Sequence, residues 1–261
     1  MSGQTPAGKS PMDAVIQQRE SLHRAGVRQL ARPHGQATDA AGRSDRETVA
    51  RDDAALNEVP SNDVATDAVP PATPAAEESL PAIAAEVAGC RLCEELATTR
   101  TQTVFGVGNP NARLCFLGEA PGADEDRRGE PFVGRAGQLL TKIIEACTLE
   151  RSDVYILNVL KCRPPKNRNP LPHEVANCRG FLNRQLALIQ PEFLCCLGAV
   201  AAQTLLETDT TIGRLRGKIL DYRGIRVVCT YHPAYLLRNP AAKQFRWDDM
   251  KMLMREMGVE L

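Results

Sequence analysis

The sequence predicts an α/β protein, a three-layer α/β/α sandwich around a central, mainly parallel, four-stranded sheet. Four short apolar runs bounded by turn residues are typical of buried strands: residues 114–117, 154–159, 193–197 and 227–230. Three helix-like stretches have apolar residues recurring at three and four positions: residues 137–147, 173–189 and 199–206. Strands that alternate with helices form a parallel sheet with helices on both faces.

The N-terminal third has a different composition. Residues 1–82 contain no Phe, Tyr or Trp and are rich in Ala, Pro and charged side chains. Such a segment buries too little apolar surface to offset its chain entropy. We therefore expect a disordered, low-complexity tail over residues 1–82, with a short helix possible near residues 13–30, and a folded domain over residues 83–261.

The charge is also uneven. The whole chain has no net charge, but residues 1–82 carry 8 basic and 12 acidic side chains, so residues 83–261 have a net charge of +4. Two basic stretches without acids lie in this domain, one at residues 161–168 and one formed by Arg214, Arg216 and Lys218. Basic stretches suit phosphate groups, although solvated basic loops are also common.

The expected location in the cell depends on whether the sequence contains a membrane span or a secretory signal. No segment is long and apolar enough to span a bilayer, and the N-terminus has no apolar core of a secretory signal. We therefore expect a cytoplasmic protein, whose nine cysteines bind metal or pack in the core rather than form disulfides.

Four cysteines are candidate ligands. Cys90 and Cys93 form a C-x-x-C pair ahead of the sheet, and Cys162 and Cys178 follow later in the chain. Four thiolates brought together by folding suit either zinc or an iron–sulfur cluster, and the spacing alone leaves both open. The other five are expected in the core: Cys115, Cys147, Cys195, Cys196 and Cys229.

Polar and backbone-constraining residues follow three of the predicted strands. Gly118, Glu119 and Ala120 follow the first, residues 161–165 follow the second, and His232 follows the fourth. Because the carboxyl ends of parallel strands share one edge, this edge is the predicted ligand site.

These motifs are similar to those of the family 4 uracil-DNA glycosylases. The similarity rests on residues 118–126, 131–140, 158–165 and 232–238, in family order and spacing, and covers the chain from about residue 88 to its end. It does not cover the tail. The resemblance implies a monofunctional enzyme of base excision repair that flips uracil out of DNA and hydrolyses its N-glycosidic bond. It also implies that Cys90, Cys93, Cys162 and Cys178 hold a structural 4Fe-4S cluster.

The resemblance further implies roles for single residues. Asn158 would read the uracil edge and Phe132 would stack on the ring, while Gly118, Glu119 and Ala120 would line the base site. His232 would donate a hydrogen bond to uracil O2 as negative charge grows there. Glu119 is the candidate for orienting water, with Asp124 and Asp126 as rivals, and Glu125 or its neighbours would exclude thymine. His173 is expected at the surface.

A DNA wedge is expected after the histidine, where Leu236 and Leu237 would fill the gap left by the flipped base and Arg238 would hold a phosphate. The alternative is that both leucines pack in the core. The chain lacks the Lys-Arg-Arg-Ile-His insertion of a relative that becomes covalently joined to DNA, which predicts multiple turnover.

Two other function classes compete with this reading, a non-catalytic nucleic-acid-binding module and a cytosolic electron-transfer protein. The partner is expected to be uracil-containing DNA, single- or double-stranded, and the protein is expected to be a monomer. No partner of the tail is predicted.

Overall fold

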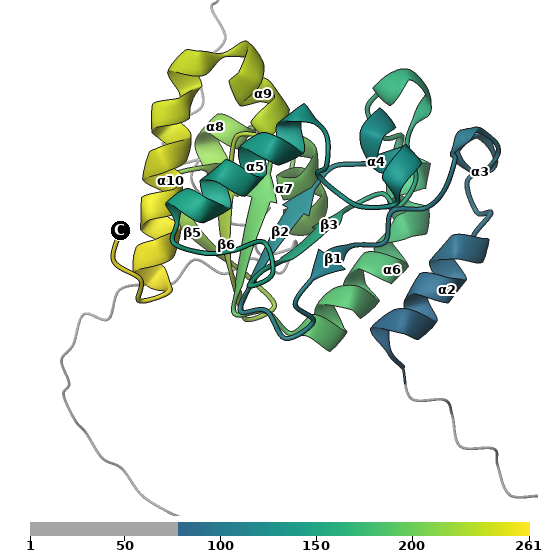
Figure 1. Cartoon of the computed structure of the whole chain (residues 1–261), viewed down its shortest axis with the longest axis horizontal. Helices are drawn as coiled ribbons and strands as arrows, with labels where there is room; N and C mark the ends of the chain where they lie inside the picture. Colours follow the sequence, from purple (N-terminus) through teal and green to yellow (C-terminus); the bar gives the residue numbers. More distant parts are fainter. Residues whose placement is uncertain (1–77) are drawn as a thin grey trace, which may run out of the picture. The chain divides into compact units, whose positions relative to one another are not determined.

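The computed structural model describes residues 78–261, which form an α/β unit (Figure 1). The predicted tail lies outside the described residues except for its end, and so does the possible helix near residues 13–30. The first helix, α2 (Leu80–Gly89), begins inside the segment assigned to the tail. Ser79 explains this earlier start, because its side-chain oxygen accepts a hydrogen bond from the amide of Ala82 at 3.3 Å.

The sheet has six strands in the order β1-β3-β2-β4-β6-β5. The four predicted strands all form and are mutually parallel: β2 (Leu114–Gly118), β3 (Tyr155–Asn158), β4 (Phe193–Leu197) and β6 (Ile225–Thr230). An antiparallel strand is added at each edge: β1 (Val107–Gly108) and β5 (Ile219–Tyr222). The α/β class is therefore confirmed, but the prediction of a four-stranded, mainly parallel sheet is wrong, because the sheet is six-stranded and mixed. β1 has only two residues, too few for an alternating pattern to be visible in the sequence.

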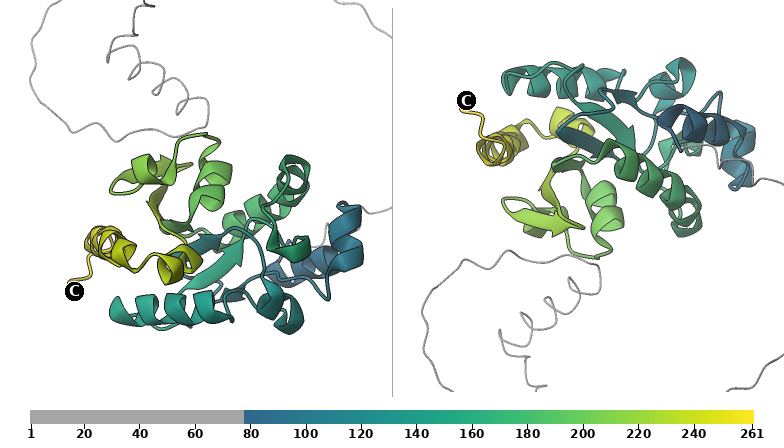
Figure 2. Two further views of the ribbon diagram at one scale, coloured as in Figure 1. Left: turned by 90° about the horizontal axis from the view of Figure 1, so that it is seen from above. Right: turned by 90° about the horizontal axis from the view of Figure 1, so that it is seen from below.

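Helices cover both faces of the sheet, as Figures 1 and 2 show. On one face, the cluster of buried side chains joins alternate strand residues to α6 (Pro172–Ile189), α7 (Ala199–Leu206) and α8 (Ile212–Leu215). On the other face, it joins the remaining strand residues to α5 (Arg135–Ala146) and α10 (Lys243–Glu256). In strands buried on both sides, successive side chains point to opposite layers, which explains the continuous apolar runs.

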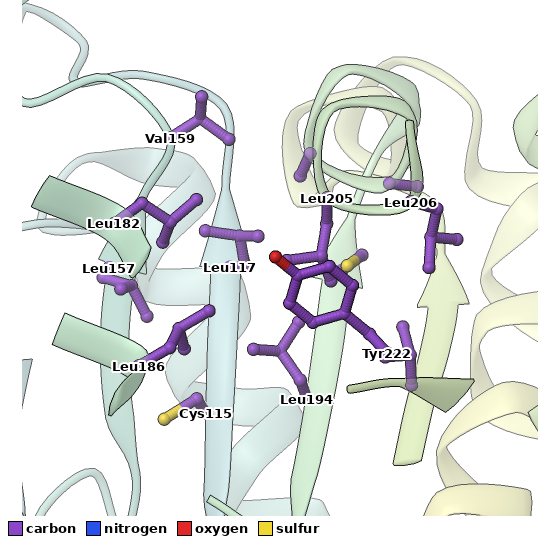
Figure 3. Close-up of a cluster of buried hydrophobic side chains, with 14 of the residues drawn as sticks. Cys115, Leu117, Leu157, Val159, Leu182, Leu186, Leu194, Leu205, Leu206 and Tyr222 are labelled. Atoms are coloured by element: carbon purple, nitrogen blue, oxygen red, sulfur yellow. The ribbon is translucent and has the colours of Figure 1, made fainter. Parts of the chain in front are cut away.

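Figure 3 shows part of the first cluster, where leucines of α6 and α7 meet those of β2, β3 and β4. Tyr222 reaches into it from the edge strand β5. The cysteines predicted in the core are all buried: Cys115, Cys147, Cys195, Cys196 and Cys229. Burial raises the pKa of the Cys115 thiol to about 12, so it remains protonated and packs as a small apolar group.

The remaining helices are short and lie at the periphery. They are α3 (Glu94–Thr99), α4 (Ala123–Arg128), η1 (Pro165–Asn167), α9 (Pro233–Arg238) and η2 (Pro240–Ala242). The described residues contain no helix that is both long and apolar enough to cross a membrane.

The register of the parallel strands aligns their carboxyl ends. Gly118 at the end of β2 pairs with Asn158 at the end of β3, and Leu197 of β4 pairs with Thr230 of β6. The loops that follow these strands therefore start from one edge of the sheet, where the sequence predicted a ligand site.

Two glycines inside helices have different surroundings, so replacing each by Ala should change the free energy of unfolding in opposite directions. Gly180 is in the interior of α6, and a Cβ added there would meet no atom within 4 Å. We predict that Gly180→Ala raises the free energy of unfolding by about 0.5–1 kcal/mol, measured by denaturant titration. Gly137 in α5 is the matched control, because a Cβ there would lie 1.8 Å from the carbonyl oxygen of Phe132. Gly137→Ala should destabilise the protein, and equal effects at both positions would contradict the prediction.

Candidate active site

A cavity of about 500 Å³ lies at the carboxyl edge of the sheet. Its walls come from the loop after β2, from α4, from the segment around Phe132, from Asn158, from the loop at 164–169 and from α9. A slightly larger hollow, of about 590 Å³, lies beside the C-terminus and is lined only by α10 and the residues after it. We place the site in the first cavity, because residues that follow several strand ends meet there.

Asn158 and Phe132 line this cavity, and both side chains lie close to the backbone of Gly118. A Cβ on Gly118 would lie 2.2 Å from Oδ1 of Asn158 and 2.6 Å from the Phe132 ring. Gly118 itself does not line the cavity. Glycine is needed at this position because the amide and the ring occupy the space of a side chain.

Asn158 has a buried amide with an unused acceptor. The residue is 2% exposed, and its Oδ1 has no hydrogen-bond partner. Its backbone carbonyl accepts a hydrogen bond from Nζ of the buried Lys161 at 2.8 Å. An unpaired buried amide oxygen costs free energy in the empty protein, so it is suited to accept an N–H from a bound ligand.

Phe132 is held in an unusual backbone conformation. Its φ is 55°, in the left-handed region that favours glycine. The Glu125 carboxylate supports this turn, because it accepts hydrogen bonds from the amides of Val133 at 2.9 Å, Gly134 at 3.0 Å and Gly122 at 3.1 Å. Both oxygens of Glu125 are thus used to shape the loop that carries the ring.

His232 begins α9 directly after β6. Its Nδ1 accepts a hydrogen bond from the amide of Ala234 at 3.1 Å, so the neutral ring has its proton on Nε2. Burial, helped by the nearby positive charge of Arg238, lowers the pKa of His232 to about 4. The imidazole lies 5.6 Å from the Phe132 ring, centre to centre. The cavity therefore contains a neutral imidazole N–H donor beside an aromatic face.

The three acidic candidates for orienting water are in different environments. Glu119 lines the cavity, and burial raises the pKa of its carboxyl. Asp124 also lines it and pairs with Arg127. Asp126 is buried outside the lining, where its carboxylate accepts hydrogen bonds from the amide of Thr101 at 3.0 and 3.1 Å. Ala120 lines the cavity beside Glu119.

The predicted wedge is divided between the core and the surface. Leu236 is completely buried and therefore packs in the core, whereas Leu237 is 40% exposed. Arg238 and Tyr235, on the same short helix, line the cavity. Leu236 was expected to contact DNA, and its burial is explained by the helical turn that directs adjacent residues to different sides.

Three residues of the cavity wall had no role assigned from the sequence: Arg135, Asn167 and Asn169. Arg168, also in the wall, belongs to the basic stretch at residues 161–168. The loop at 164–169 has two residues with positive φ, Lys166 and Asn167, and Nε of Arg163 donates to Oδ1 of Asn167 at 2.7 Å. Arg168 pairs with Glu95 and Glu174 at 2.7 Å each. The only sequence signal for this wall was the run of Asn, Pro and basic residues.

The four candidate cysteine ligands come from three segments of the chain but lie near one another. Burial raises the pKa of the Cys162 thiol, Arg100 lowers it, and the thiols of Cys90 and Cys93 raise it. Burial also raises the pKa of Cys178 to about 11, with contributions from the thiols of Cys162 and Cys93. These mutual effects indicate that the four thiols share one region.

Basic and polar side chains surround this group of thiols. Nη1 of Arg100 donates to Sγ of Cys162 at 2.9 Å, and Nδ2 of Asn177 donates to Sγ of Cys93 at 3.4 Å. Between residues 78 and 261, no group of three or more His, Cys, Asp or Glu side chains has the geometry to hold a single metal ion. His173 is exposed, as expected.

Comparison with known proteins places this site in a family. The family model of the Uracil DNA glycosylase superfamily matches residues 105–251. The Type-4 uracil-DNA glycosylase of Archaeoglobus fulgidus is 47% identical over 184 residues, which cover 67% of this chain and 92% of that protein. The Thermotoga maritima Type-4 enzyme is 44% identical over 165 residues, covering 62% and 85%. A Type-5 uracil-DNA glycosylase of Pyrobaculum aerophilum is 34% identical over 149 residues, covering 51% and 66%. The chain therefore belongs to the uracil-DNA glycosylase superfamily and, within it, to the Type-4 enzymes.

Proposed function

We propose that this protein removes uracil from DNA by hydrolysing its N-glycosidic bond, which leaves an abasic site for base excision repair. The names of its relatives support this activity. The observation that carries the proposal is the unpaired Oδ1 of the buried Asn158, which lies against Phe132 at the floor of the cavity. A base inside a duplex cannot reach this floor, so the nucleotide must rotate out of the stack.

Asn158 supplies discrimination between bases. Its Oδ1 would accept a hydrogen bond from N3–H of uracil while its Nδ2 donates to O4. Cytosine presents an acceptor and a donor at these two positions, the reverse pattern. Because Asn158 is buried, a mismatched base would leave the oxygen and the NH2 group of its amide without hydrogen-bond partners. Such a base would bind much more weakly.

Phe132 supplies affinity for the flipped ring. Aromatic stacking accepts any base, so Phe132 contributes binding energy and little specificity. Glu125 contributes indirectly by fixing the turn that presents this ring. Exclusion of thymine would then depend on how closely this part of the wall approaches C5 of the base.

His232 would stabilise the departing uracil. As the glycosidic bond breaks, the sugar becomes oxocarbenium-like and negative charge grows on uracil O2. An N–H donor aimed at that oxygen stabilises the transition state more than the ground state. The lowered pKa of His232 keeps the ring neutral at neutral pH, and its Nε2–H remains available.

Glu119 is the residue that we propose to orient the attacking water. It lines the cavity next to Ala120, and its ionised carboxylate would also stabilise positive charge on the sugar. Asp124 is held by Arg127, and Asp126 by Thr101, so neither carboxylate is as free to act. On the DNA side, Arg238 would contact phosphate and Leu237 would fill the space left by the base.

We further propose that Cys90, Cys93, Cys162 and Cys178 hold a 4Fe-4S cluster. The donor set fits, because four thiols share one region and four Cys thiolates are the usual ligands of a 4Fe-4S cluster. Arg100 places positive charge beside these thiols, which suits a group with net negative charge. The buried Lys161 also lies near Cys178 and Cys162, although burial lowers its pKa to about 7. When bound, the cluster would cross-link three segments of the chain: the Cys90–Cys93 pair, Cys162 and Cys178. Its role would be structural, because hydrolysis needs no electron transfer.

The activity is tested with a labelled DNA strand that contains one uracil, treated with alkali after incubation to cleave abasic sites. We expect cleavage at uracil and none in matched strands with thymine or cytosine. Asn158→Ala and His232→Ala should each lower the single-turnover rate by about 100-fold, because each removes a positioned polar contact to the base.

Gly180→Ala is the control variant and should cleave like the unmodified protein. Absence of cleavage by protein that retains its iron would contradict the proposed activity and favour a DNA-binding module without catalysis.

The dependence of excision on pH separates Glu119 from His232. Because burial raises the pKa of Glu119, its carboxylate is lost first as the pH falls, whereas His232 stays neutral down to about pH 4. We predict a single-turnover rate that is level around neutral pH and that begins to decline, as the pH falls, before His232 becomes protonated near pH 4. In Glu119→Gln the rate should be lower but the decline should move towards pH 4. An unchanged decline in this variant would show that Glu119 is not the titrating group.

The cluster is tested through iron content. Cys162→Ala removes a ligand, so we expect less iron per protein and weaker visible absorbance than in the unmodified protein. Cys147→Ala is the matched control, because Cys147 is buried in the core and should leave the iron content unchanged. Full iron in Cys162→Ala would show that the ligand assignment is wrong.

A further inference from the structure

A row of three aromatic rings and one guanidinium group runs from the cavity to the start of α10. Tyr235 stacks on Tyr231, with ring centres 5.0 Å apart and planes inclined by 28°. The guanidinium of Arg216 lies 5.5 Å from the Tyr231 ring and 4.9 Å from the Phe245 ring. We call these four side chains the aromatic row.

The centre of the aromatic row is rigidly held. Arg216 binds the buried Asp249 of α10 through two hydrogen bonds, from Nε to Oδ2 at 3.0 Å and from Nη2 to Oδ1 at 2.9 Å. Asp249 also accepts from the Thr230 hydroxyl at 2.8 Å, at the end of β6. The two hydrogen bonds to a buried carboxylate therefore fix the orientation of the planar Arg216 guanidinium.

The ends of the row are open to solvent. Tyr235 is 39% exposed and Phe245 is 51% exposed. Tyr235 lines the cavity and Tyr231 immediately precedes His232, so the row begins at the site that we propose for uracil. Figure 1 shows α9 and α10, which carry its two ends, following one another at the same side of the sheet. A ring needed only for the core would be buried, which Phe245 is not.

The charge beside the row is positive. Arg214 and Lys218 flank Arg216 in the chain, Lys243 is two residues before Phe245, and all three side chains are exposed. Arg214, Arg216 and Lys218 form the second basic stretch of the sequence, and none of them lines the cavity proposed for uracil. Exposed aromatic rings interleaved with basic groups are the usual means by which proteins bind single-stranded nucleic acid, because every base offers a face for stacking.

We propose that the aromatic row is a binding site for the single-stranded DNA that flanks the flipped uracil. A base of the flanking strand stacks on Phe245 at the end of the row away from the cavity, and the exposed basic side chains contact the phosphates. In a duplex the bases are stacked on one another and present no free face, so the row favours single-stranded over double-stranded substrate. The proposal deepens the proposed function and rests on it for the position of the uracil.

The test measures DNA affinity apart from catalysis. The complete, iron-loaded protein is titrated into fluorescent, uracil-free DNA, as a single strand and as the corresponding duplex, and binding is followed by anisotropy. Phe245→Ala should weaken binding to the single strand by about tenfold, the loss expected for one stacked base, with a smaller effect on the duplex. Phe245→Trp, which keeps an aromatic face, should restore the affinity.

Two further variants sharpen the test. Arg214→Ala should lower the slope of log Kd against log salt concentration for the single strand by about 0.7, the value for one phosphate contact. Leu261→Ala is the control for loss of an exposed apolar side chain, since Leu261 is 49% exposed at the chain end. It should bind like the unmodified protein.

Equal affinity of Phe245→Ala and the unmodified protein for the single strand would overturn the proposal, as would equal losses on single strand and duplex. Thermal melting of each variant checks that it remains folded. Failure of the proposed function is a separate result, because it would be seen as absence of uracil cleavage by the unmodified protein whatever the anisotropy shows.

Discussion

The parallel pairing of β2 with β3 sets the geometry on which the site depends. It places Gly118 opposite Asn158 at the ends of the two strands, and the missing side chain of Gly118 leaves space for the Asn158 amide and the Phe132 ring. Leaving Oδ1 of Asn158 unpaired costs about 1–3 kcal/mol in the free protein. In the function that we propose, a base with an N–H donor at this position would recover that cost, so the unpaired oxygen would contribute to selectivity.

Holding these groups in place requires support from several sides. The left-handed backbone at Phe132 costs about 1–2 kcal/mol, and three amide hydrogen bonds to Glu125 offset it. Nζ of Lys161 donates a hydrogen bond to the backbone carbonyl of Asn158, and Lys161 also lies near the thiols of Cys178 and Cys162. Asn158, which we propose to read the base, Lys161 and the proposed cluster ligand Cys162 thus lie in one segment, residues 158–162. The Asp249 carboxylate accepts hydrogen bonds from both Thr230 and Arg216. It therefore links the end of β6, two residues before His232, to the aromatic row.

Much of the fold and site could be predicted from local sequence patterns. The four central strands were visible because strands buried on both faces are continuous apolar runs, and Glu119 and His232 were visible because they follow strands. Asn158 and Phe132 were identified by the resemblance of their motifs to those of a known family, and all four residues line the cavity. The edge strands were not visible. β1 is two residues long, and β5 alternates between half-buried and buried positions with a charged residue, so neither has a distinctive pattern.

The sequence by itself determined the α/β class, the strand-end motifs and the family, because each depends on residues close together in the chain. Only the tertiary structure decided which of two adjacent leucines faces solvent, that Glu125 shapes a loop, that Asp126 is turned away from the cavity and that Arg216 meets Asp249, 33 residues away. These outcomes depend on which elements pack together. Contacts between distant segments leave no periodic trace in the sequence, whereas the alternation of strands and helices does.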